Sequence, residues 1–472
     1  YILRTGLGIE RTYTSMTIIP PLLTRKGLLE VILGTSDNSI LVLYEASSVD
    51  RKNIIEDQQL QGKIEAPVIK MAVAPNGVFL ACYRSDGILT VLTSAFTKKV
   101  LDFDAKSVSC PIEIAWCGED AVVMQWRNTG IVMVGPYGDW LNFPYETSVH
   151  LVAENDCCRI ITTEKCEILQ RILSSTISIR SVGSTDPAAL MFDAMEAFEE
   201  GDPKSDENIR SIATSNQLND AVQACIHAAS NEFDISNQQS FLKAASYGKA
   251  FCPDLDPTEF VEIARKLRVL NEIRKPAIGL PLTIYQYNRL TPEVVVARLT
   301  SRNHHFLALQ ICEILKLKKE RILIHWGCEK IKKLSLNNKI TDIEINNIIR
   351  KNLDKYNKIS YLNLAEIAFL MNRKHLAIIL LNNENHPSLQ IPLLLKMNED
   401  EIALNKAINS NDTDLIYSTL ILLENRICLK YNNNIEYFYK ILINYNESIN
   451  LLKIYHNNKI TSDNRTKLHT LL

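Results

Sequence analysis

The chain has 472 residues, with 52 Lys and Arg against 54 Asp and Glu, so its formal net charge is −2. This length exceeds what one hydrophobic core supports and indicates at least two domains. The near-neutral charge argues against general nucleic-acid binding, which needs a basic surface. No apolar run approaches the roughly 18–20 residues of a membrane-spanning helix.

The eleven cysteines are scattered and form no Cys-x-x-Cys pair. We therefore expect reduced thiols in a cytosolic protein, and we expect the adjacent pair Cys157-Cys158 to pack within a strand. The sequence begins at Tyr1 and not at Met. This start predicts that the chain is part of a longer protein, so a signal peptide cannot be judged from its first residues.

Residues 1 to about 175 have the pattern of β-strands. In the clearest unit, Asn76-Gly77 and Asp86-Gly87 separate apolar runs, and these dipeptides favour hairpin turns because they tolerate positive φ. Four strands per roughly 40 residues is typical of a β-propeller blade. The alternative is a β-sandwich. The predicted strands are Leu29–Leu33, Ile40–Tyr44, Val68–Val73, Val78–Cys82, Ile88–Leu92, Thr97–Phe103, Ile112–Trp116, Ala121–Trp126, Ile131–Val134, Asp139–Phe143, Val149–Val152, Arg159–Thr163 and Cys166–Leu173.

These strands account for only some four blades, so residues 1–178 are predicted to be the C-terminal blades of an incomplete propeller. Residues 179–210 are predicted to be a linker containing one helix. Thr185 or Asp186 is expected to cap that helix, with Pro187 in its first turn. Its stripe of Met and Phe is expected to be core.

Residues 211–472 are predicted to form helices joined by short loops, which make neighbouring helices antiparallel. Helix pairs that contact only their neighbours form an α-solenoid, here without a consensus TPR or HEAT repeat. The predicted helices are Leu218–Ala229, Gln239–Phe251, Pro257–Ile273, Pro292–Thr300, His305–Leu315, Arg321–Leu334, Asp342–Asn352, Tyr361–Met371, Lys374–Asn382, Pro392–Met397, Glu401–Ser410, Asp414–Glu424 and Ile435–Tyr455.

The stretch from residue 267 to 331 has the clearest helix boundaries. Thr283 and Gln286 have the spacing of a capping box, in which each side chain bonds the other residue's backbone N–H. Thr291 is expected to be the N-cap of a second helix that begins with Pro292. Leu290 and Val295 have the spacing of a hydrophobic staple. We expect this stretch to be a packing element that forms no functional site.

No catalytic constellation is evident, so we expect no enzyme, no metal and no cofactor. His304-His305 and His325 with Cys328 offer metal ligands, but a site needs three or four converging groups. Glycine-rich phosphate loops and a Gly-x-Ser-x-Gly elbow are missing. The basic clusters at residues 316–321 and 330–333 are typical of solvated helix faces, and contact with anionic lipid or an acidic partner is the alternative.

Several long blocks carry a family resemblance. RVLNEIR, IGLPLTIYQYNRLT, FLALQICEILKL and ILIHWGCEKI occur in this order, and LNDAVQACIHAA precedes them. They resemble blocks of the vacuolar protein sorting-associated protein 16 family, core subunits of the HOPS and CORVET endosomal tethering complexes. The resemblance covers roughly residues 150–460. It implies that the start of the propeller and the last part of the solenoid lie outside this sequence.

The resemblance implies a non-enzymatic scaffold that acts at endosomal and vacuolar or lysosomal membranes as a peripheral subunit. It implies binding of a Sec1/Munc18-like (SM-type) subunit through the C-terminal solenoid, joining to other propeller–solenoid subunits, and indirect contact with SNAREs and Rab GTPases. Carried onto this chain, the SM-binding surface would lie near residues 412–455. Solenoid core is the alternative for each candidate residue. The candidates are Leu415, Tyr417, Leu420, Tyr437, Leu451 and Tyr455.

Two other functions fit the expected architecture. A vesicle-coat or nuclear-pore scaffold uses the same propeller-plus-solenoid arrangement. An enzyme with its site on the central face of the propeller is the third hypothesis, although no motif indicates a substrate. The proteins that co-purify with the chain distinguish a tethering-complex scaffold from a coat or nuclear-pore scaffold.

Overall fold

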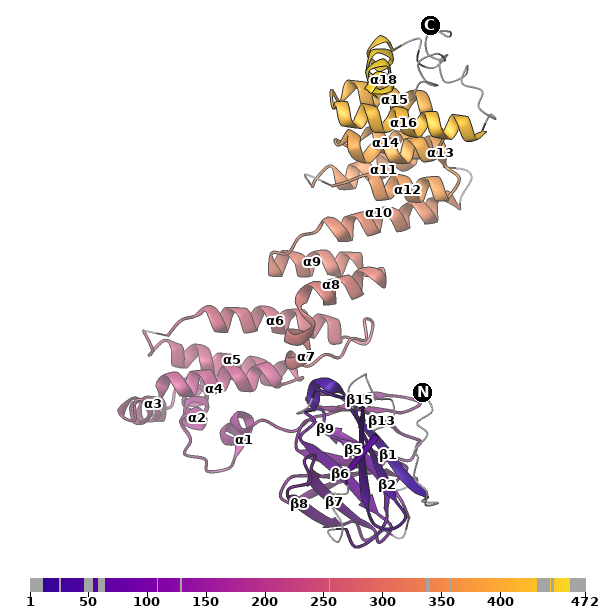
Figure 1. Ribbon diagram of the computed structural model, residues 1–472. Coiled ribbons are helices and arrows are strands. Elements are labelled where there is room, and N and C mark those ends of the chain that lie inside the picture. Colours follow the sequence, from indigo (N-terminus) through magenta and orange to yellow (C-terminus); the bar gives the residue numbers. More distant parts are fainter. Residues whose placement is uncertain are drawn as a thin grey trace. The chain divides into compact units, whose positions relative to one another are not determined.

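The computed structural model (Figure 1) describes residues 12–24, 27–45, 54–57, 64–107, 109–127, 130–253, 255–336, 340–356, 359–430, 442 and 445–458. The chain divides into two compact units, residues 1–286 and residues 287–472. The first unit contains all the described strands and the first helices, and the second is helical. A β-rich N-terminal region followed by a helical region confirms that part of the predicted fold.

The first unit contains separate antiparallel sheets, each built from strands consecutive in sequence. Three of the sheets have four strands and the last has three. The first sheet holds β1 (Tyr13–Ile19), β2 (Glu30–Thr35), β3 (Ile40–Glu45) and β4 (Ile54–Asp57). The second holds β5 (Val68–Val73), β6 (Phe79–Arg84), β7 (Ile88–Thr93) and β8 (Lys99–Asp104). The third holds β9 (Glu113–Cys117), β10 (Ala121–Trp126), β11 (Gly130–Val134) and β12 (Trp140–Phe143), and the fourth β13 (His150–Ala153), β14 (Cys158–Ile161) and β15 (Cys166–Leu169).

Turn chemistry explains why most strands were predicted within a few residues. Gly77 and Gly87 adopt φ of 74° and 87°, and Asn38 adopts φ of 59°, as the turns require. Strands β1 and β4 were not predicted. A 3-10 turn at Pro21–Leu23 lies between β1 and β2 in place of a short Asn-Gly or Asp-Gly turn. The last predicted strand is too long, since β15 ends at Leu169 and a helix begins at Ser174.

Apolar cores lie between successive sheets. The first core includes Ile32 and Leu80, the second Trp116 and Leu89, and the third Val123. The first strands of the sheets are neighbours in turn, since β1 contacts β5, β5 contacts β9, and β9 contacts β13. This arrangement of separate sheets does not match the two layers of a sandwich.

The helices of the first unit pack on one another in sequence order, with α2 against α3 and α4 against α5. Asp186 is the N-cap of α2 and Pro187 follows it, as predicted, although the Asp186 side chain makes no cap hydrogen bond. Helix α3 was not predicted, because its polar sequence has few apolar positions to reveal it. These helices are α1 (Ser174–Arg180), α2 (Pro187–Glu200), α3 (Lys204–Thr214), α4 (Leu218–Asn231), α5 (Ile235–Lys249) and α6 (Thr258–Arg274), and α7 (Ile284–Leu290) spans the boundary between the units.

The helices of the second unit also contact near neighbours in the chain, as α8 with α9, α12 with α13 and α14 with α15. They are α8 (Pro292–Ser301), α9 (His305–Leu315), α10 (Glu320–Ser335), α11 (Asp342–Leu353), α12 (Leu362–Leu370), α13 (Lys374–Asn382), α14 (Pro387–Lys396), α15 (Asp400–Asn409), α16 (Thr413–Lys430) and α18 (Asn446–Asn458). One predicted start is wrong. Helix α14 begins at Pro387, in whose first turn a missing N–H is harmless, and it continues through Pro392.

Within the described ranges, no helix combines the length and the apolar run needed to cross a bilayer.

Candidate functional site

The capping box at the start of α7 is confirmed. The backbone N–H of Gln286 donates to the Thr283 hydroxyl over 3.1 Å, and the backbone N–H of Thr283 donates to Gln286 Oε1 over 3.4 Å. Both residues belong to the first unit. The box satisfies N–H groups that a helix start otherwise leaves unpaired.

The same two side chains also reach a loop between β13 and β14. Gln286 Nε2 donates to the carboxylates of Glu154 and Asp156, the latter over 3.0 Å. The Thr283 hydroxyl donates to the other oxygen of Asp156. We call these residues, together with Arg159 and Cys157, the joint cluster, because they tie the last sheet to the segment that begins α7.

Arg159 is the cation of the joint cluster. Its Nε donates to Glu154 Oε1 over 2.5 Å, and its Nη2 donates to the carbonyl of Pro281 and to Gln286 Oε1, both over 3.1 Å. The side chain of Arg159 is only 15% exposed. One guanidinium therefore holds a carboxylate of the sheet and the backbone of the incoming segment at once.

The loop before the joint is held from its other end by Arg274, the last residue of α6. Its Nε donates to the carbonyl of Leu282 over 3.0 Å, and its Nη1 donates to the carbonyl of Glu232 over 3.3 Å. The guanidinium lies 3.9 Å from the ring centre of Phe233, and burial lowers its pKa to about 10. Residues 275–282 are thus pinned at both ends.

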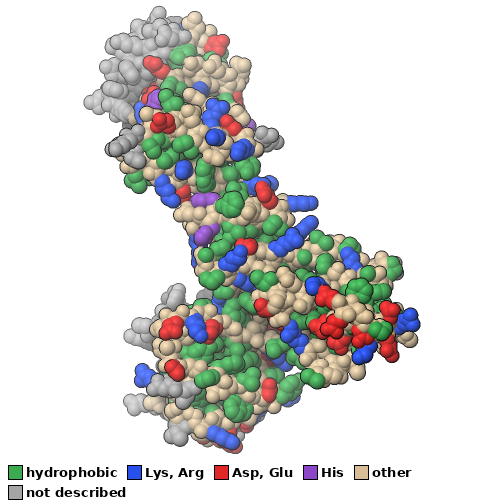
Figure 2. All heavy atoms as spheres, turned by 180° about the vertical axis from the view of Figure 1, so that it is seen from behind, with side chains coloured by type: hydrophobic (Ala, Val, Ile, Leu, Met, Phe, Trp, Pro, Cys, Tyr) green, Lys and Arg blue, Asp and Glu red, His purple; other side chains and the backbone are tan. Residues whose placement is uncertain are grey.

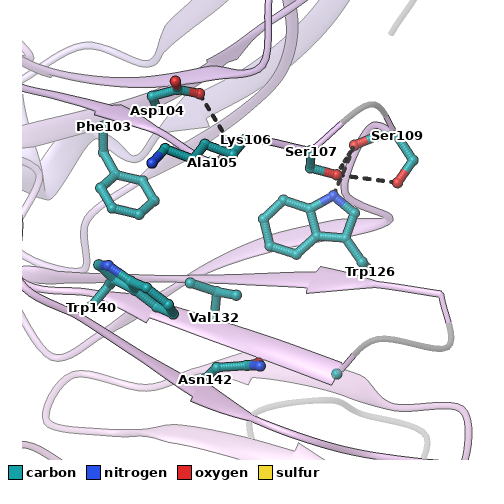
Figure 3. A pocket seen from close by; sticks show the side chains of 11 residues that line it. Phe103, Asp104, Ala105, Lys106, Ser107, Ser109, Trp126, Val132, Trp140 and Asn142 are labelled. Carbon is teal, nitrogen blue, oxygen red and sulfur yellow. Dashed lines mark hydrogen bonds between the residues drawn. The ribbon is translucent and has the colours of Figure 1, made fainter.

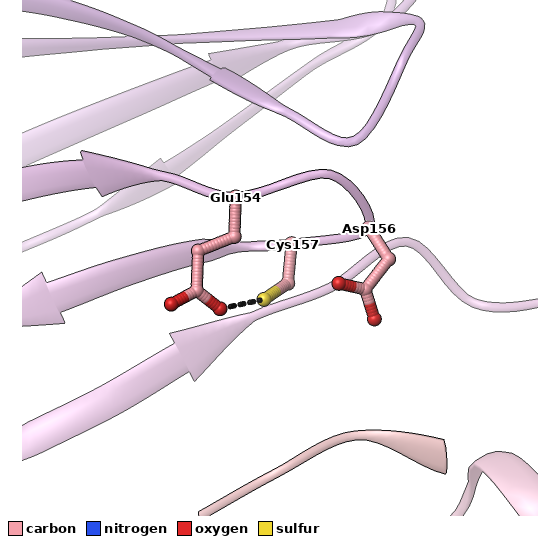
Figure 4. Close-up of side chains that lie close together, drawn as sticks. All are labelled: Glu154, Asp156 and Cys157. Atoms are coloured by element: carbon pink, nitrogen blue, oxygen red, sulfur yellow. Dashed lines mark hydrogen bonds between the residues drawn. The ribbon is translucent and has the colours of Figure 1, made fainter. Parts of the chain in front are cut away.

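Three ligand-type side chains meet in the joint cluster (Figure 4). One potential ligand atom from each of Glu154, Asp156 and Cys157 lies within 4.8 Å of the others. The thiol of Cys157 donates to Glu154 over 3.3 Å, and burial together with the charges of Asp156 and Glu154 raises its pKa, which disfavours the thiolate that binds metal. Because the carboxylate oxygens already accept bonds from Arg159, Gln286 and Thr283, we assign the cluster a structural role.

The adjacent thiols therefore separate, since Cys158 packs in the core beside the third sheet while Cys157 faces the joint. The stretch 267–331 was predicted to pack without forming a site, and its N-terminal part proves to build this contact. The signal that sequence reasoning missed is the acidic pair Glu154 and Asp156 beside Arg159.

The position of the second predicted cap in this stretch is confirmed, but its hydrogen bond is not formed. Thr291 is the N-cap residue of α8 and Pro292 follows it, but the Thr291 side chain makes no cap hydrogen bond. Its φ of 68° lies in the left-handed region, which rotates the side chain away from an ordinary cap geometry. The Leu290–Val295 staple stays a prediction.

The histidines noted in the sequence come together in the second unit. His305 Nε2 and His325 Nδ1 lie 2.9 Å apart, joining α9 to α10. Burial and the neighbouring charge of His325 lower the pKa of His305. Among the described residues, no third ligand joins this pair within metal-binding distance, so the contact is a hydrogen bond between helices.

The predicted SM-binding residues fall into three groups. Leu420 is fully buried, in agreement with the alternative that it is core. Leu415 and Leu451 are partly buried against that core, and the rings of Tyr417 and Tyr455 lie 6.2 Å apart across α16 and α18. Tyr437 lies outside the described residues. The most exposed apolar side chains here, Leu422 at 56% and Ile454 at 52%, were not among the candidates.

One other face is strongly charged. Figure 2 shows acidic side chains gathered over α2 and α3. Lys243 pairs with Glu199 over 2.8 Å, and Asp206 and Glu207 lie in the first turn of α3, where they complement the helix dipole. These contacts give the face a structural explanation.

Comparison with known proteins gives consistent matches. Residues 12–262 match the family described as "Vps16, N-terminal region", and residues 359–471 match "Vps16, C-terminal region". The chain is 39% identical over 410 residues to "Protein VACUOLELESS1" of Arabidopsis thaliana, covering 85% of this chain and 47% of that protein. It is 40% identical over 382 residues to "Vacuolar protein sorting-associated protein 16 homolog" of Dictyostelium discoideum, covering 80% and 45%.

The chain thus spans about half the length of these relatives. Among solved structures, a β-propeller domain of Cps50 (Swd1) from Myceliophteria thermophila is similar over 34% of this chain and 55% of that chain, at 12% identity and a TM-score of 0.26.

Proposed function

Because the chain belongs to the Vps16 family, we propose that it is a non-enzymatic scaffold subunit of an endosomal and vacuolar or lysosomal membrane-tethering complex. The two regional family matches support this function, since they follow one another along the chain in the family's order. The complexes expected from the family are HOPS and CORVET. In this role the chain associates peripherally with the cytoplasmic face of these membranes and supports SNARE-mediated fusion through its partners.

The proposed architecture is a partial propeller over residues 1–178, a linker over 179–210 and an α-solenoid over 211–472. The contacts between first strands of successive sheets support the propeller, because the innermost strands of blades adjoin one another. Helix contacts with near neighbours in sequence support the solenoid.

The proposed SM-binding surface lies on α16 and α18. Leu415, Tyr417, Leu451 and Tyr455 remain candidates, since none of them is fully buried. Leu422 and Ile454 join them because each exposes more than half of its side-chain area to solvent. Leu420 is dropped, because a buried side chain offers no contact area to a partner. Tyr437 stays a prediction from the family resemblance.

A binding measurement between this chain and the SM-type subunit of the same organism tests the proposal. Leu415→Asp and Leu451→Asp are expected to weaken binding at least tenfold while the helical circular dichroism signal is unchanged. Leu422→Asp tests the exposed position, and Phe306→Asp is the matched control, since Phe306 is 75% exposed on α9.

Three outcomes would reject parts of the proposal. Loss of helicity in Leu415→Asp and Leu451→Asp assigns those residues to the core. Full binding by folded variants rejects the α16–α18 surface. Co-purification with coat or nuclear-pore proteins and without the SM-type subunit rejects the tethering function and supports the coat or pore scaffold.

A further inference from the structure

A hollow of about 490 Å³ opens along the seam between the second and third sheets (Figure 3). It lies between the end of β8 and strands β11 and β12. Its size is within the range of pockets that hold small ligands or a few peptide side chains. The proposed tethering function makes no use of it.

Aromatic side chains form the walls of this seam hollow. Trp126 is 7% exposed, its Nε1 donates to the carbonyl of Ser109 over 2.8 Å, and its ring contacts Tyr83 edge-on at 6.3 Å. It is therefore a fixed wall. Trp140 is 59% exposed, and Figure 3 shows it near Phe103 on the facing side. A large exposed tryptophan beside a rigid apolar wall is typical of a binding surface.

The strand that carries Trp140 has an unpaired edge. In its sheet β12 is the terminal strand and pairs only with β11 among the described strands. The register pairs Trp140 with Val134 and Asn142 with Val132. The side chains of Trp140 and Asn142 therefore lie on the same face of the sheet, the face that lines the hollow. An edge strand beside apolar side-chain pockets is the arrangement that accepts an added peptide strand.

One positive charge borders the seam hollow. Lys106 is exposed, and no described carboxylate forms an ion pair with its ammonium group. Figure 3 shows its side chain reaching toward Phe103. The carboxylate of Asp104 is engaged locally, since it accepts the backbone N–H of Lys106 over 2.9 Å. Asp104 and Lys106 thus give the rim one negative and one positive charge, and the Lys106 ammonium is the group that a ligand carboxylate would contact.

The seam continues beyond the hollow. A second hollow of about 60 Å³ lies between β8 and the third sheet, and apolar side chains line it, including Leu101 and Val134. Val100, which lines this second hollow, is 41% exposed. An extended segment has this elongated shape, whereas a compact metabolite does not.

We propose that this seam binds an extended peptide segment of another protein, which inserts a bulky apolar side chain against Trp140 and Trp126, sets a neighbouring carboxylate on Lys106, and pairs its backbone with the free edge of β12. The peptide is defined by its bulky apolar side chain, its neighbouring carboxylate and its extended backbone. The interaction is separate from SM-subunit binding at α16 and α18.

An array of 12-residue peptides tests the proposal on the full chain. Each peptide carries Trp, Phe or Leu at its centre, flanked by Glu, Lys or Ser. Glu-flanked peptides are expected to bind at least tenfold more tightly than Lys-flanked ones, and Trp140→Ala is expected to lower that binding at least tenfold. Tyr137→Ala is the matched control, because Tyr137 is 89% exposed near the start of β12 and does not line the hollow.

Two further arms isolate the charge and the backbone. Lys106→Glu is expected to invert the preference toward Lys-flanked peptides. Two versions of a bound peptide are N-methylated, one at the odd-numbered and one at the even-numbered residues. Only one version is expected to lose at least tenfold in affinity, because alternate N–H groups point toward the partner strand.

The proposal fails if no peptide class distinguishes the unaltered chain from the folded Trp140→Ala variant, or if Lys106→Glu leaves the charge preference unchanged. Trp140-dependent binding of phosphatidylcholine vesicles without peptide binding would assign the seam to a membrane surface and overturn the proposal. If Trp140→Ala reduces the folded fraction, the uncharged variant Asn142→Tyr replaces it, since that side chain fills the hollow from an exposed position without changing the charge of the rim.

Discussion

The joint cluster and the α16–α18 packing connect segments by opposite physical means. In the joint cluster, Arg159, Gln286 and Thr283 make directed hydrogen bonds to two carboxylates. Between α16 and α18, buried Leu420 and Leu452 belong to an apolar core that extends through the preceding helices. Hydrogen bonds to charged groups depend on exact partners and geometry, whereas apolar packing mainly depends on volume.

The joint cluster and the α16–α18 packing are therefore expected to tolerate substitutions differently. A conservative exchange in the joint cluster removes a specific donor and leaves a carboxylate unpaired. A conservative exchange between apolar residues in α16 leaves the core nearly intact. Substitutions in each place test this difference.

Truncating the apolar core has the largest expected effect. Leu420→Ala is expected to lower the free energy of unfolding by about 3 kcal/mol, because a fully buried leucine loses its contacts and leaves a cavity. Denaturant titration followed by circular dichroism measures the change. Leu422→Ala, two residues along the same helix but 56% exposed, is expected to change it by less than about 0.5 kcal/mol. Equal losses would contradict the assigned burial.

Removing the cation of the joint cluster comes next. Arg159→Met is expected to lower the free energy of unfolding of the first unit by about 2 kcal/mol, since Glu154 then stays partly buried without its partner. The control is Arg171→Met. Arg171 pairs with Asp120 but is 51% exposed, so its loss is expected to be nearly neutral. A neutral Arg159→Met would show that solvent reaches the joint.

Deleting the capping hydroxyl has a smaller expected effect. Thr283→Val keeps the side-chain volume but removes the acceptor for the Gln286 N–H and the donor to Asp156. The expected loss is about 1 kcal/mol, typical of an N-cap. Thr283→Ser retains the hydroxyl and is expected to preserve most of the stability. Hydrogen exchange of the Gln286 amide gives a local readout that should accelerate only in the valine variant.

The smallest expected effect is a pH dependence of the stability of the second unit, caused by the contact between His305 and His325. Because the pKa of folded His305 lies below its ordinary value, the unfolded chain binds the proton first as the pH falls through about 6.5. Stability is therefore expected to fall from that pH toward the lower folded pKa. His325, Lys333 and His304 oppose the charge on His305, and Glu329 favours it.

Thermal unfolding between pH 7.5 and 5.5 measures this dependence. His305→Gln should flatten the slope, because it removes the group that titrates differently in the two states. His386→Gln is the control, since His386 is exposed and its side chain makes no cap bond at α14. Identical slopes in all three proteins would contradict the assignment.

The features that sequence reasoning predicted are local ones. Asn-Gly and Asp-Gly mark hairpins because positive φ is a property of the residues themselves. The Thr283–Gln286 box was found because both partners lie within four residues. At Thr291 the predicted N-cap position is correct but a positive φ leaves the side chain without a cap hydrogen bond, and α14 begins at Pro387, before the predicted Pro392.

The long-range features were not predictable in the same way. Gln286 meets Asp156 across 130 residues of sequence, and no local pattern pairs them. Leu420 and Leu422 are identical residues two positions apart on α16. The contacts of the helix with its neighbours decide which of the two is buried. The aromatic residues of the seam hollow likewise come from three strands, β8, β10 and β12, so only the fold brings them together.

The dual role of Gln286 has a consequence for the order of assembly during synthesis. Chains fold from the N-terminus as they emerge from the ribosome. Glu154, Asp156 and Arg159 are therefore made long before residues 283–286. The carboxylates of Glu154 and Asp156 are synthesised first, in the loop after β13. Formation of the capping box then positions the Gln286 side-chain amide that donates to them. A nascent chain that exposes residues only up to 282 should keep Glu154 on Arg159 while Asp156 lacks its Thr283 and Gln286 partners, and the contact should be completed once residues 283–286 have left the ribosome.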